Sequence, residues 1–340
     1  MKDKKNIFKD KKILITGVTG FLGSWAAIWA LESGASVIGI SRTEAKGNSN
    51  FSSCRLKQKI SMEKGSIADK DFLYEVCEKH KPDYIIHLAG QAIDDKDEKN
   101  GKAAYEVNIL GTLAVLESAC KYNFIQGCVF VTTSKCYVDM NWKTSYSRSK
   151  GCADILIETY YKKYFSKKKD CAIVNVILCN VIGGGDFGKN RLIPYCIESL
   201  INRKNIEIKT PEDPIYFNSV FEVINGIYCG LESALLLQDR PSSSFFELKY
   251  KKRMRVGELV DMVKRLYYKD KLKSDKQVDD ININMMHGSN KIKFSNQLPI
   301  QDIILSTIEW YVKSLGEDDI YELCAKQLRQ FKVQLEGETF

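Results

Sequence analysis

Apolar and polar residues alternate along the first half of the chain in two repeating patterns. Short runs rich in β-branched residues predict strands, and the stretches between them carry apolar residues at helical spacing. The predicted strands are 12–16, 36–40, 84–88, 128–132 and 171–178. The predicted helices are 21–32, 72–80, 103–122 and 146–165. Strands that alternate with helices are typical of a parallel sheet covered by helices on both faces.

The pattern becomes less regular after Gly183-Gly184-Gly185, where short strands mix with helices such as 256–267 and 301–315. We therefore expect an α/β fold, with a Rossmann-type doubly wound parallel sheet of six or seven strands and a smaller C-terminal α/β substrate-binding portion. The expected division places a cofactor-binding domain at 1–182. The substrate-binding portion at 183–340 should be partly interleaved with it.

Composition and charge exclude several classes of protein. The longest apolar runs are about ten residues, whereas a membrane-spanning helix needs about 20. The basic N-terminus leads into Ile13-Leu-Ile-Thr-Gly17 without the apolar stretch of a signal peptide, so we expect a cytoplasmic protein. The net charge of +8 comes from scattered lysines rather than one block. We therefore expect neither nucleic acid nor a membrane as a partner.

The cysteines and histidines do not suggest a metal site or disulfides. None of the 11 cysteines lies in a C-x-x-C pair, and Cys128, Cys171 and Cys179 lie within or beside apolar runs. They are interpreted as buried free thiols in a reducing compartment. Only three histidines occur, without an acidic cluster at ligand spacing. His87 ends a buried strand, which is more typical of a core or cofactor-adjacent histidine than of a catalyst.

The first predicted strand runs directly into Gly17-x-x-Gly20-x-x-Gly23, and a predicted helix follows. In a dinucleotide-binding turn the first glycine permits the tight turn and the second lets the backbone approach the pyrophosphate. The third lets the helix pack close to the sheet, with its N-terminal dipole facing the phosphates. The placement of these glycines after the first strand predicts a dinucleotide cofactor.

The end of the second predicted strand bears on the choice between NAD and NADP. An acid at this place holds the ribose 2′-hydroxyl of NAD, but the chain has Ser41 and Arg42 here. Because an arginine suits a 2′-phosphate, the chemistry of this position alone favours NADP.

Tyr146 and Lys150 lie one helical turn apart on the same face of a predicted helix. The ammonium group of Lys150 can lower the phenol pKa and hold the nicotinamide ribose, while Tyr146 acts as acid or base on a sugar hydroxyl. A Y-x-x-x-K match alone is common by chance in a chain with 17 tyrosines. Its simpler interpretation is an exposed helix pair.

Four motifs occur together, however, in the order found in extended short-chain dehydrogenases. They are the glycine turn, His87-Leu-Ala-Gly-Gln91, Asn108-x-x-Gly111-Thr112 and Tyr146-x-x-x-Lys150. Within that superfamily, the chain resembles the CDP-glucose 4,6-dehydratase family. The similar segments are FLGSWAAIWALESGASVIGI, HLAGQA, TTSKCY, NVIGGGDFGKNRLIP and the T-x-E-W-Y pattern from Thr307 to Tyr311.

The resemblance implies NAD as cofactor, a nucleotide-sugar pocket in the C-terminal portion, and a homodimer. NAD is therefore the expected cofactor and NADP the alternative. Similar dehydratases oxidise the sugar at C4, eliminate water across C5 and C6, and return the hydride to C6. By the resemblance, Thr133 takes the position that orients the C4 oxygen and Lys135 matches the family's lysine. Ser134 stands where the family has an aspartic acid that protonates the leaving hydroxyl.

This substitution leaves two outcomes open. A serine hydroxyl is a poor proton donor, and general acid catalysis is typically worth about 10²- to 10⁴-fold. Either another acid supports elimination, or the enzyme is a C4 dehydrogenase or 4-epimerase. Ile215 also replaces an arginine expected near the nucleotide phosphates, so the base and sugar are left open. A non-catalytic nucleotide-binding protein is the remaining alternative, and Thr133, Tyr146 and Lys150 argue against it.

The candidate residues fall into three groups. The catalytic candidates are Thr133, Ser134, Lys135, Tyr146 and Lys150. The cofactor-binding candidates are Gly17, Thr19, Gly20, Phe21, Leu22, Gly23, Ser41, Arg42, Ser66, Ile67, Leu88, Ala89, Gly90 and Asn108, together with Tyr146 and Lys150. The substrate-binding candidates are Gln91, Asn180, Arg191 and Leu192.

Overall fold

The structure is a computed structural model, and it describes most of the chain. The described residues are 6–45, 47–91, 101–134, 144–166, 171–188, 190–236, 244–247, 253–268, 298–316 and 318–336. Of the candidate site residues, Lys135 lies outside them.

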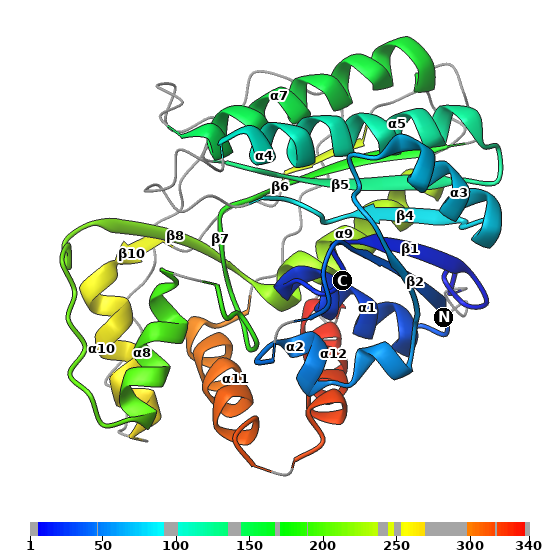
Figure 1. Cartoon of the computed structure of the whole chain (residues 1–340). Helices are drawn as coiled ribbons and strands as arrows, with labels where there is room; N and C mark the ends of the chain where they lie inside the picture. The colour runs from blue at the N-terminus through cyan, green and yellow to red at the C-terminus, as the bar shows by residue number, and fades with distance from the viewer. Residues whose placement is uncertain are drawn as a thin grey trace.

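A seven-stranded parallel sheet forms the centre of the molecule, with strand order β3-β2-β1-β4-β5-β6-β9 (Figure 1). Its strands are β1 (Lys12–Thr16), β2 (Ser36–Ser41), β3 (Ser61–Lys64), β4 (Tyr84–His87), β5 (Gly127–Thr133), β6 (Ala172–Leu178) and β9 (Ser244–Glu247). The order reverses between β1 and β4, which is the switch point where dinucleotides bind in folds of this kind. The predicted doubly wound α/β fold is therefore confirmed.

Helices cover both faces of this sheet. One face carries α3 (Lys70–His80), α4 (Gly101–Tyr105), α5 (Gly111–Lys121) and α7 (Ser145–Tyr160). The other face carries α1 (Phe21–Glu32), α9 (Val220–Leu236) and α12 (Ile320–Glu336). Short helical segments α2 (Asn50–Ser53) and η1 (Leu56–Gln58) connect β2 to β3. Each face buries its own apolar cluster, as expected for strands that are hydrophobic on both sides.

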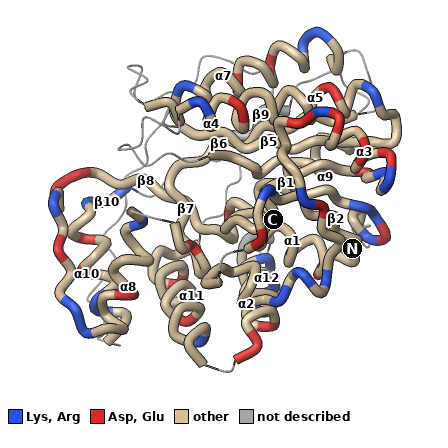
Figure 2. Tube along the Cα trace, viewed as in Figure 1, with Lys and Arg blue, Asp and Glu red and all other residues tan. Residues whose placement is uncertain are grey.

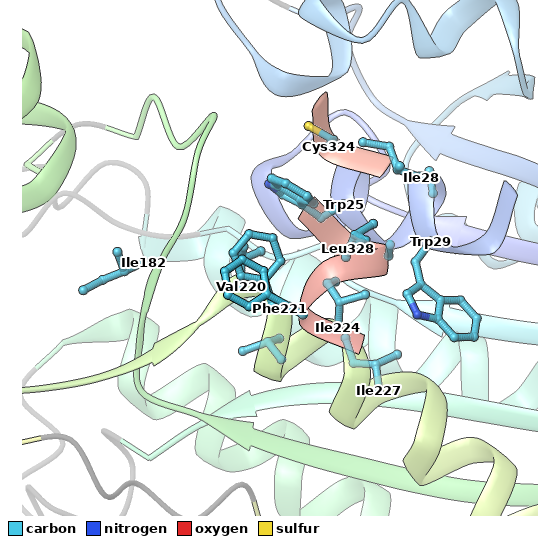
Figure 3. Close-up of a cluster of buried hydrophobic side chains, with 14 of the residues drawn as sticks. Trp25, Ile28, Trp29, Ile182, Val220, Phe221, Ile224, Ile227, Cys324 and Leu328 are labelled. Carbon is cyan, nitrogen blue, oxygen red and sulfur yellow. The ribbon is translucent and has the colours of Figure 1, made fainter. Parts of the chain in front are cut away.

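The helices α1, α9 and α12 pack together through buried hydrophobic side chains (Figure 3). The ring of Trp25 meets Phe221 edge-on with centroids 5.3 Å apart, and Phe221 stacks on Phe331 at 4.2 Å. Trp29 stacks on Tyr228 with centroids 3.6 Å apart. Because α9 and α12 follow residue 183, the C-terminal half of the chain supplies much of the core beneath the sheet.

A smaller three-stranded sheet, β10-β8-β7, lies beside the main one. It consists of β7 (Asn180–Ile182), β8 (Pro214–Ser219) and β10 (Arg253–Arg255). The helices α8 (Leu192–Ile201), α10 (Val256–Tyr267) and α11 (Ile300–Lys313) pack around it (Figure 1). The strand β9 then returns to the edge of the main sheet, where it pairs in parallel with β6. The two portions therefore exchange elements, and the division at residue 182 stays a prediction.

The predicted strands and helices end within two residues of the observed ones. One difference concerns two long helices that were predicted as uninterrupted. The first contains a π-helical segment, η3 (Glu106–Leu110), between α4 and α5, and the second ends in another, η4 (Tyr161–Phe165). Such widened turns are frequent at functional sites. The segment η3 carries Asn108, one of the cofactor candidates.

Charged residues are distributed over the outer helices and loops, with basic and acidic positions interspersed (Figure 2). All ten cysteines in the described residues are free thiols; Cys128 and Cys171 are buried, whereas Cys179 is only half-buried. No helix in the described part of the chain is long and apolar enough to cross a membrane. Among the same residues, no group of three or more His, Cys, Asp or Glu side chains is arranged to hold a metal ion.

Candidate active site

The glycine turn begins where β1 ends. Gly17 has a φ of +70°, and a Cβ there would lie 2.8 Å from the backbone of Ala89. Gly23 lies against the same turn, because its Cβ would be only 2.2 Å from the Gly17 carbonyl oxygen. Gly20 is the N-cap of α1, and none of the described side chains caps this helix. The backbone amide groups at the start of α1 are therefore suited to bind an anion. The three glycines, which have no side chains, leave room for that anion beside the turn.

An open cleft extends from this turn along the carboxyl edge of the sheet. It encloses about 680 Å³ together with the solvent at its mouth. Nine of the cofactor candidates line it: Gly17, Thr19, Gly20, Ser41, Arg42, Ile67, Leu88, Ala89 and Gly90. Ile40, Thr43, Gly65 and Val107 also line it and were not among the candidates. Gly65 was detectable in principle, because it directly follows β3 at the same edge of the sheet.

The remaining cofactor candidates lie around this cleft without lining it. Phe21 and Leu22 form the first turn of α1 and are half-buried against the core. Ser66 accepts a hydrogen bond from the backbone N–H of Ala68 at 3.3 Å. Asn108 is buried and connects two parts of the site: it accepts from the Gln91 N–H at 3.0 Å and donates to Ser149 Oγ at 2.8 Å.

Among the described residues, no carboxylate lines the cleft at the end of β2. The hydroxyl groups of Thr19 and Ser41 lie 2.8 Å apart, and Ser41 donates to the Thr43 carbonyl at 2.7 Å. The exposed guanidinium of Arg42 donates to Gln91 Oε1 at 3.0 Å. A cofactor candidate thus contacts a substrate candidate across the carboxyl edge of the sheet, from the end of β2 to the segment that follows β4.

Lys150 lies beside Gly90, in the wall of the cleft. A Cβ at Gly90 would be 3.4 Å from Lys150 Nζ, and this ammonium donates to the Val131 carbonyl at 2.9 Å. Tyr146 precedes it by one turn of α7, whose start is capped by Thr144 through a capping box. Thr133 and Ser134 are buried at the end of β5, where the Ser134 N–H donates to the Leu178 carbonyl at 2.8 Å. The catalytic candidates therefore converge on this edge from β5 and α7.

His87 is a buried side chain that is held in the neutral form, so it is not suited to act as a catalytic acid. It lies 2.8 Å from Thr16 Oγ1 through Nδ1 and 3.3 Å from Thr112 Oγ1 through Nε2. Burial, together with the positive charge of Lys150, lowers the pKa of His87 to about 3. The ring therefore fixes β1, β4 and α5 relative to one another beneath the cleft.

The substrate candidates other than Gln91 lie in the smaller sheet and at the start of α8. Asn180, in β7, donates to the Tyr216 carbonyl at 2.9 Å and so connects β7 to β8. Arg191 is the N-cap of α8, and Leu192 is its first residue. The half-exposed Arg191 side chain approaches Asp186, with 3.5 Å between Nε and Oδ2. Burial raises the pKa of Asp186, although Arg191 and the Gly188 N–H oppose this effect.

Comparison with known proteins agrees with this arrangement. The chain matches the NAD dependent epimerase/dehydratase family over residues 13–233. It therefore belongs to this family of enzymes, which act on nucleotide sugars.

Two curated relatives and one solved structure illustrate the similarity. The chain is 30% identical over 238 residues to a CDP-glucose 4,6-dehydratase of Salmonella typhimurium, covering 65% of this chain and 66% of that protein. It is 29% identical over 256 residues to a dTDP-D-glucose 4,6-dehydratase of Dictyostelium discoideum, covering 66% and 57%. The matched region thus spans no more than about two thirds of either relative. A UDP-glucose 4-epimerase from Thermotoga maritima, solved with UDP-glucose, has the same fold: the TM-score is 0.69 at 18% identity, covering 90% of this chain and 100% of that one.

Proposed function

We propose that this protein binds NAD in the cleft at the carboxyl edge of the main sheet and oxidises a nucleotide-linked sugar at C4. The proposed overall activity is that of a CDP-glucose 4,6-dehydratase, with a 4-keto-6-deoxy sugar as product. The observation that carries the proposal is the position of Lys150, whose ammonium lies against Gly90 in the wall of the cleft. Tyr146 lies one helical turn before Lys150 in α7, where its phenol would meet the sugar.

The described residues fit a dinucleotide. The turn from Gly17 to Gly23 leaves a cradle that side chains would fill, and α1 begins there without a side-chain cap from the described residues. When bound, NAD accepts a hydride and later returns it. Because none of the described residues places a carboxylate in the cleft beside Ser41 and Arg42, NADP stays the alternative cofactor.

The chain's own residues divide the proton chemistry of C4 oxidation. The ammonium group of Lys150 would stabilise Tyr146 as the phenolate, and this phenolate would take the proton from the C4 hydroxyl and become the neutral phenol. Thr133, at the end of β5, would orient the C4 oxygen. Lys150 is held in place by the Val131 carbonyl, and Asn108 and Ser149 connect the neighbouring turn of α7 to the segment that carries Gly90 and Gln91.

A second candidate function follows from Ser134. Elimination of water needs a proton donor to the leaving C6 hydroxyl, and Ser134 occupies the position of the acid in similar dehydratases. If no other group donates this proton, the 4-keto sugar formed by oxidation at C4 is either released or reduced again from the opposite face of its carbonyl group. The protein would then be a C4 dehydrogenase or a 4-epimerase.

Incubation of the purified protein with CDP-, GDP-, UDP- and dTDP-glucose distinguishes these reactions by product mass and absorbance near 320 nm. Loss of one water indicates dehydration, and loss of two hydrogens with accumulating NADH indicates dehydrogenation. Unchanged mass with altered stereochemistry indicates epimerisation. A Ser134→Asp variant that gains elimination would support the second candidate, whereas an efficient wild-type dehydratase would show that another group donates this proton.

The matched test of the catalytic residue is Tyr146→Phe. We expect turnover to fall about 10³-fold, the range of general acid–base catalysis, while the cofactor stays bound. Tyr268→Phe, which changes an exposed tyrosine just after α10, should leave turnover unchanged. Equal activity of both variants toward every nucleotide sugar that the wild type converts would remove Tyr146 from the mechanism. Complete inactivity of the wild type would instead favour a non-catalytic binding protein.

We also propose that the protein is a homodimer that pairs through α4, α5 and α7. These helices lie side by side on the outer face of the sheet (Figure 1), and their region exposes apolar side chains. The exposed residues are Tyr105, Leu110, Ile155 and Tyr164. Light scattering should give the mass of two chains. Ile155→Arg, at a side chain that is 57% exposed, should give the mass of one without loss of helix content.

A further inference from the structure

The T-x-E-W-Y motif near the end of the chain contacts the loop that follows β7. Residues 183–188 form this loop, and Trp310 and Tyr311 of α11 pack against it. The phenol of Tyr311 donates to the Asp186 carbonyl at 2.6 Å. A Cβ at Gly184 would lie 2.1 Å from Cγ of Trp310, so the indole rests directly on the loop backbone. Phe187 meets both rings edge-on at 5.9 and 5.7 Å.

The opposite side of the loop is held from the cofactor-binding portion. The indole N–H of Trp25, in α1, donates to the Gly184 carbonyl at 2.9 Å. Asn50, at the start of α2, accepts from the indole N–H of Trp310 at 3.1 Å and donates to Ser24 Oγ of α1 at 3.0 Å. These contacts are buried. The 183–188 loop is therefore clamped between α1 and α11, which lie far apart in sequence.

The position of this loop determines where Arg191 points. The Asp186 carboxylate accepts the Gly188 N–H at 3.0 Å and pairs with Arg191 Nε at 3.5 Å. The Arg191 side chain is 45% exposed, so its charge remains accessible to a ligand. A shift of the Asp186 backbone moves the carboxylate and with it the guanidinium group. Tyr311 acts on this pair only through the carbonyl group that it holds.

We propose that Tyr311 is a positioning residue for nucleotide-sugar binding, which sets the 183–188 loop so that Arg191 faces the diphosphate of the substrate. The inference rests on the proposed function and deepens it, because it assigns a role to a motif far from the catalytic residues. Trp310 supports the same loop and connects it through Asn50 to the cofactor helix.

Tyr311→Phe tests the inference, and the fold supplies a matched control. Tyr122 is also a buried tyrosine whose hydroxyl donates one hydrogen bond, to Glu78 Oε1 at 2.7 Å. It follows α5 in the apolar cluster on the other face of the sheet from α1. Tyr122→Phe therefore removes a phenol hydrogen bond at a place where substrate positioning should not change.

Two measurements on the NAD-loaded full chain compare these variants. In hydrogen exchange, the amides of 183–188 should exchange faster in Tyr311→Phe and at the wild-type rate in Tyr122→Phe. In titration with CDP-glucose, Tyr311→Phe should bind about fivefold more weakly, as the loss of one hydrogen bond suggests, while NAD binding is unchanged. Phe187→Ala, which removes a half-exposed ring without opening the core, should also speed exchange in the loop.

The outcomes separate the two proposals. Equal exchange of 183–188 in the two tyrosine variants overturns the positioning role, whether or not nucleotide sugars bind. Faster exchange with unchanged CDP-glucose affinity also overturns it, because the loop would then move without affecting the substrate. A wild-type chain that binds none of CDP-, GDP-, UDP- and dTDP-glucose overturns the proposed function and with it the substrate part of this inference.

Discussion

The cofactor turn contains three glycines and the 183–188 loop begins with three, but different parts of the chain surround them. In the cofactor turn, Gly23 packs against Gly17 and Val18, which lie within seven residues, and the outside contact comes from the segment that follows β4. In the loop, Gly183, Gly184 and Gly185 lie against Val220, Trp310 and Asn50. The first site is largely local in sequence, whereas the second exists only after distant helices have packed. Substitutions in the cofactor turn should therefore affect the binding of NAD, and substitutions in the loop should affect the binding of the nucleotide sugar.

The largest effect is expected at the cofactor turn. Gly23→Ala would place a Cβ 2.2 Å from the Gly17 carbonyl oxygen, and a backbone neighbour has little freedom to move away. We expect a loss of about 3 kcal/mol in the free energy of unfolding, together with much weaker NAD binding. Denaturant unfolding and NAD titration measure the two effects. Gly47→Ala, at an exposed glycine with nothing within 4 Å of its Cβ, is the control and should change stability by less than about 0.5 kcal/mol. A stable, NAD-binding Gly23→Ala variant would contradict the assigned turn.

A smaller effect is expected in the loop. Gly184→Ala would bring a Cβ to 2.1 Å from Cγ of the buried Trp310, so relief of this clash requires α11 and the loop to move apart. We expect a loss of about 2 kcal/mol in stability, weaker CDP-glucose binding and unchanged NAD affinity. Calorimetric titration with each ligand separates these results. If Gly184→Ala weakened the binding of NAD and of CDP-glucose equally, the two glycine sites would not be distinct.

The acid sensitivity of the cofactor portion should depend on His87. Its folded-state pKa of about 3 lies below the ordinary value of 6.5, so the unfolded chain binds the proton first. Stability should therefore fall as the pH drops below about 6.5, by about 1 kcal/mol between pH 7 and pH 5.5 from this group. His87→Gln should be less stable at pH 7 but should lose about 1 kcal/mol less on acidification. If the free energy of unfolding fell equally with pH in the wild type and in His87→Gln, His87 would not be held neutral.

The smallest effect is expected at the cofactor-specificity position. Arg42 is exposed and bonds to Gln91, and among the described residues no carboxylate lines the cleft beside it. Arg42→Ala should weaken NADP binding about fivefold, as expected for loss of one exposed charge contact, and change NAD binding less than about twofold. Fluorescence titration with both cofactors measures the ratio of the NADP affinity to the NAD affinity. If this ratio were unchanged in Arg42→Ala, Arg42 would have no role in cofactor selection.

Much of the cofactor side could be predicted because its signals are local. The spacing of Gly17, Gly20 and Gly23, and of Tyr146 and Lys150, corresponds to single turns of backbone, so sequence distance translates directly into geometry. Nine predicted residues line the observed cleft. Val107 was missed because it reaches the cleft from η3, a widened turn that the apolar pattern of a regular helix does not reveal.

Much less of the substrate side could be predicted. Asn50, Asp186, Trp310 and Tyr311 were not among the candidate residues, although the last three lie in segments that resemble a known family. Their contacts join distant positions, such as Trp310 and Asn50, which are 260 residues apart. Such pairs have no periodicity along the chain, and only tertiary packing brings α11 to the start of α2.

The sequence by itself determined the alternation of strands and helices, the glycine turn and the Tyr146–Lys150 pair, because each depends on residues within a few turns of one another. The tertiary structure decided that β9 returns to the main sheet, that Arg42 reaches Gln91, and that α11 holds the 183–188 loop. The physical reason is the same in all three cases. These contacts form only when burial of apolar surface brings distant segments together, and backbone and side-chain hydrogen bonds then select one arrangement.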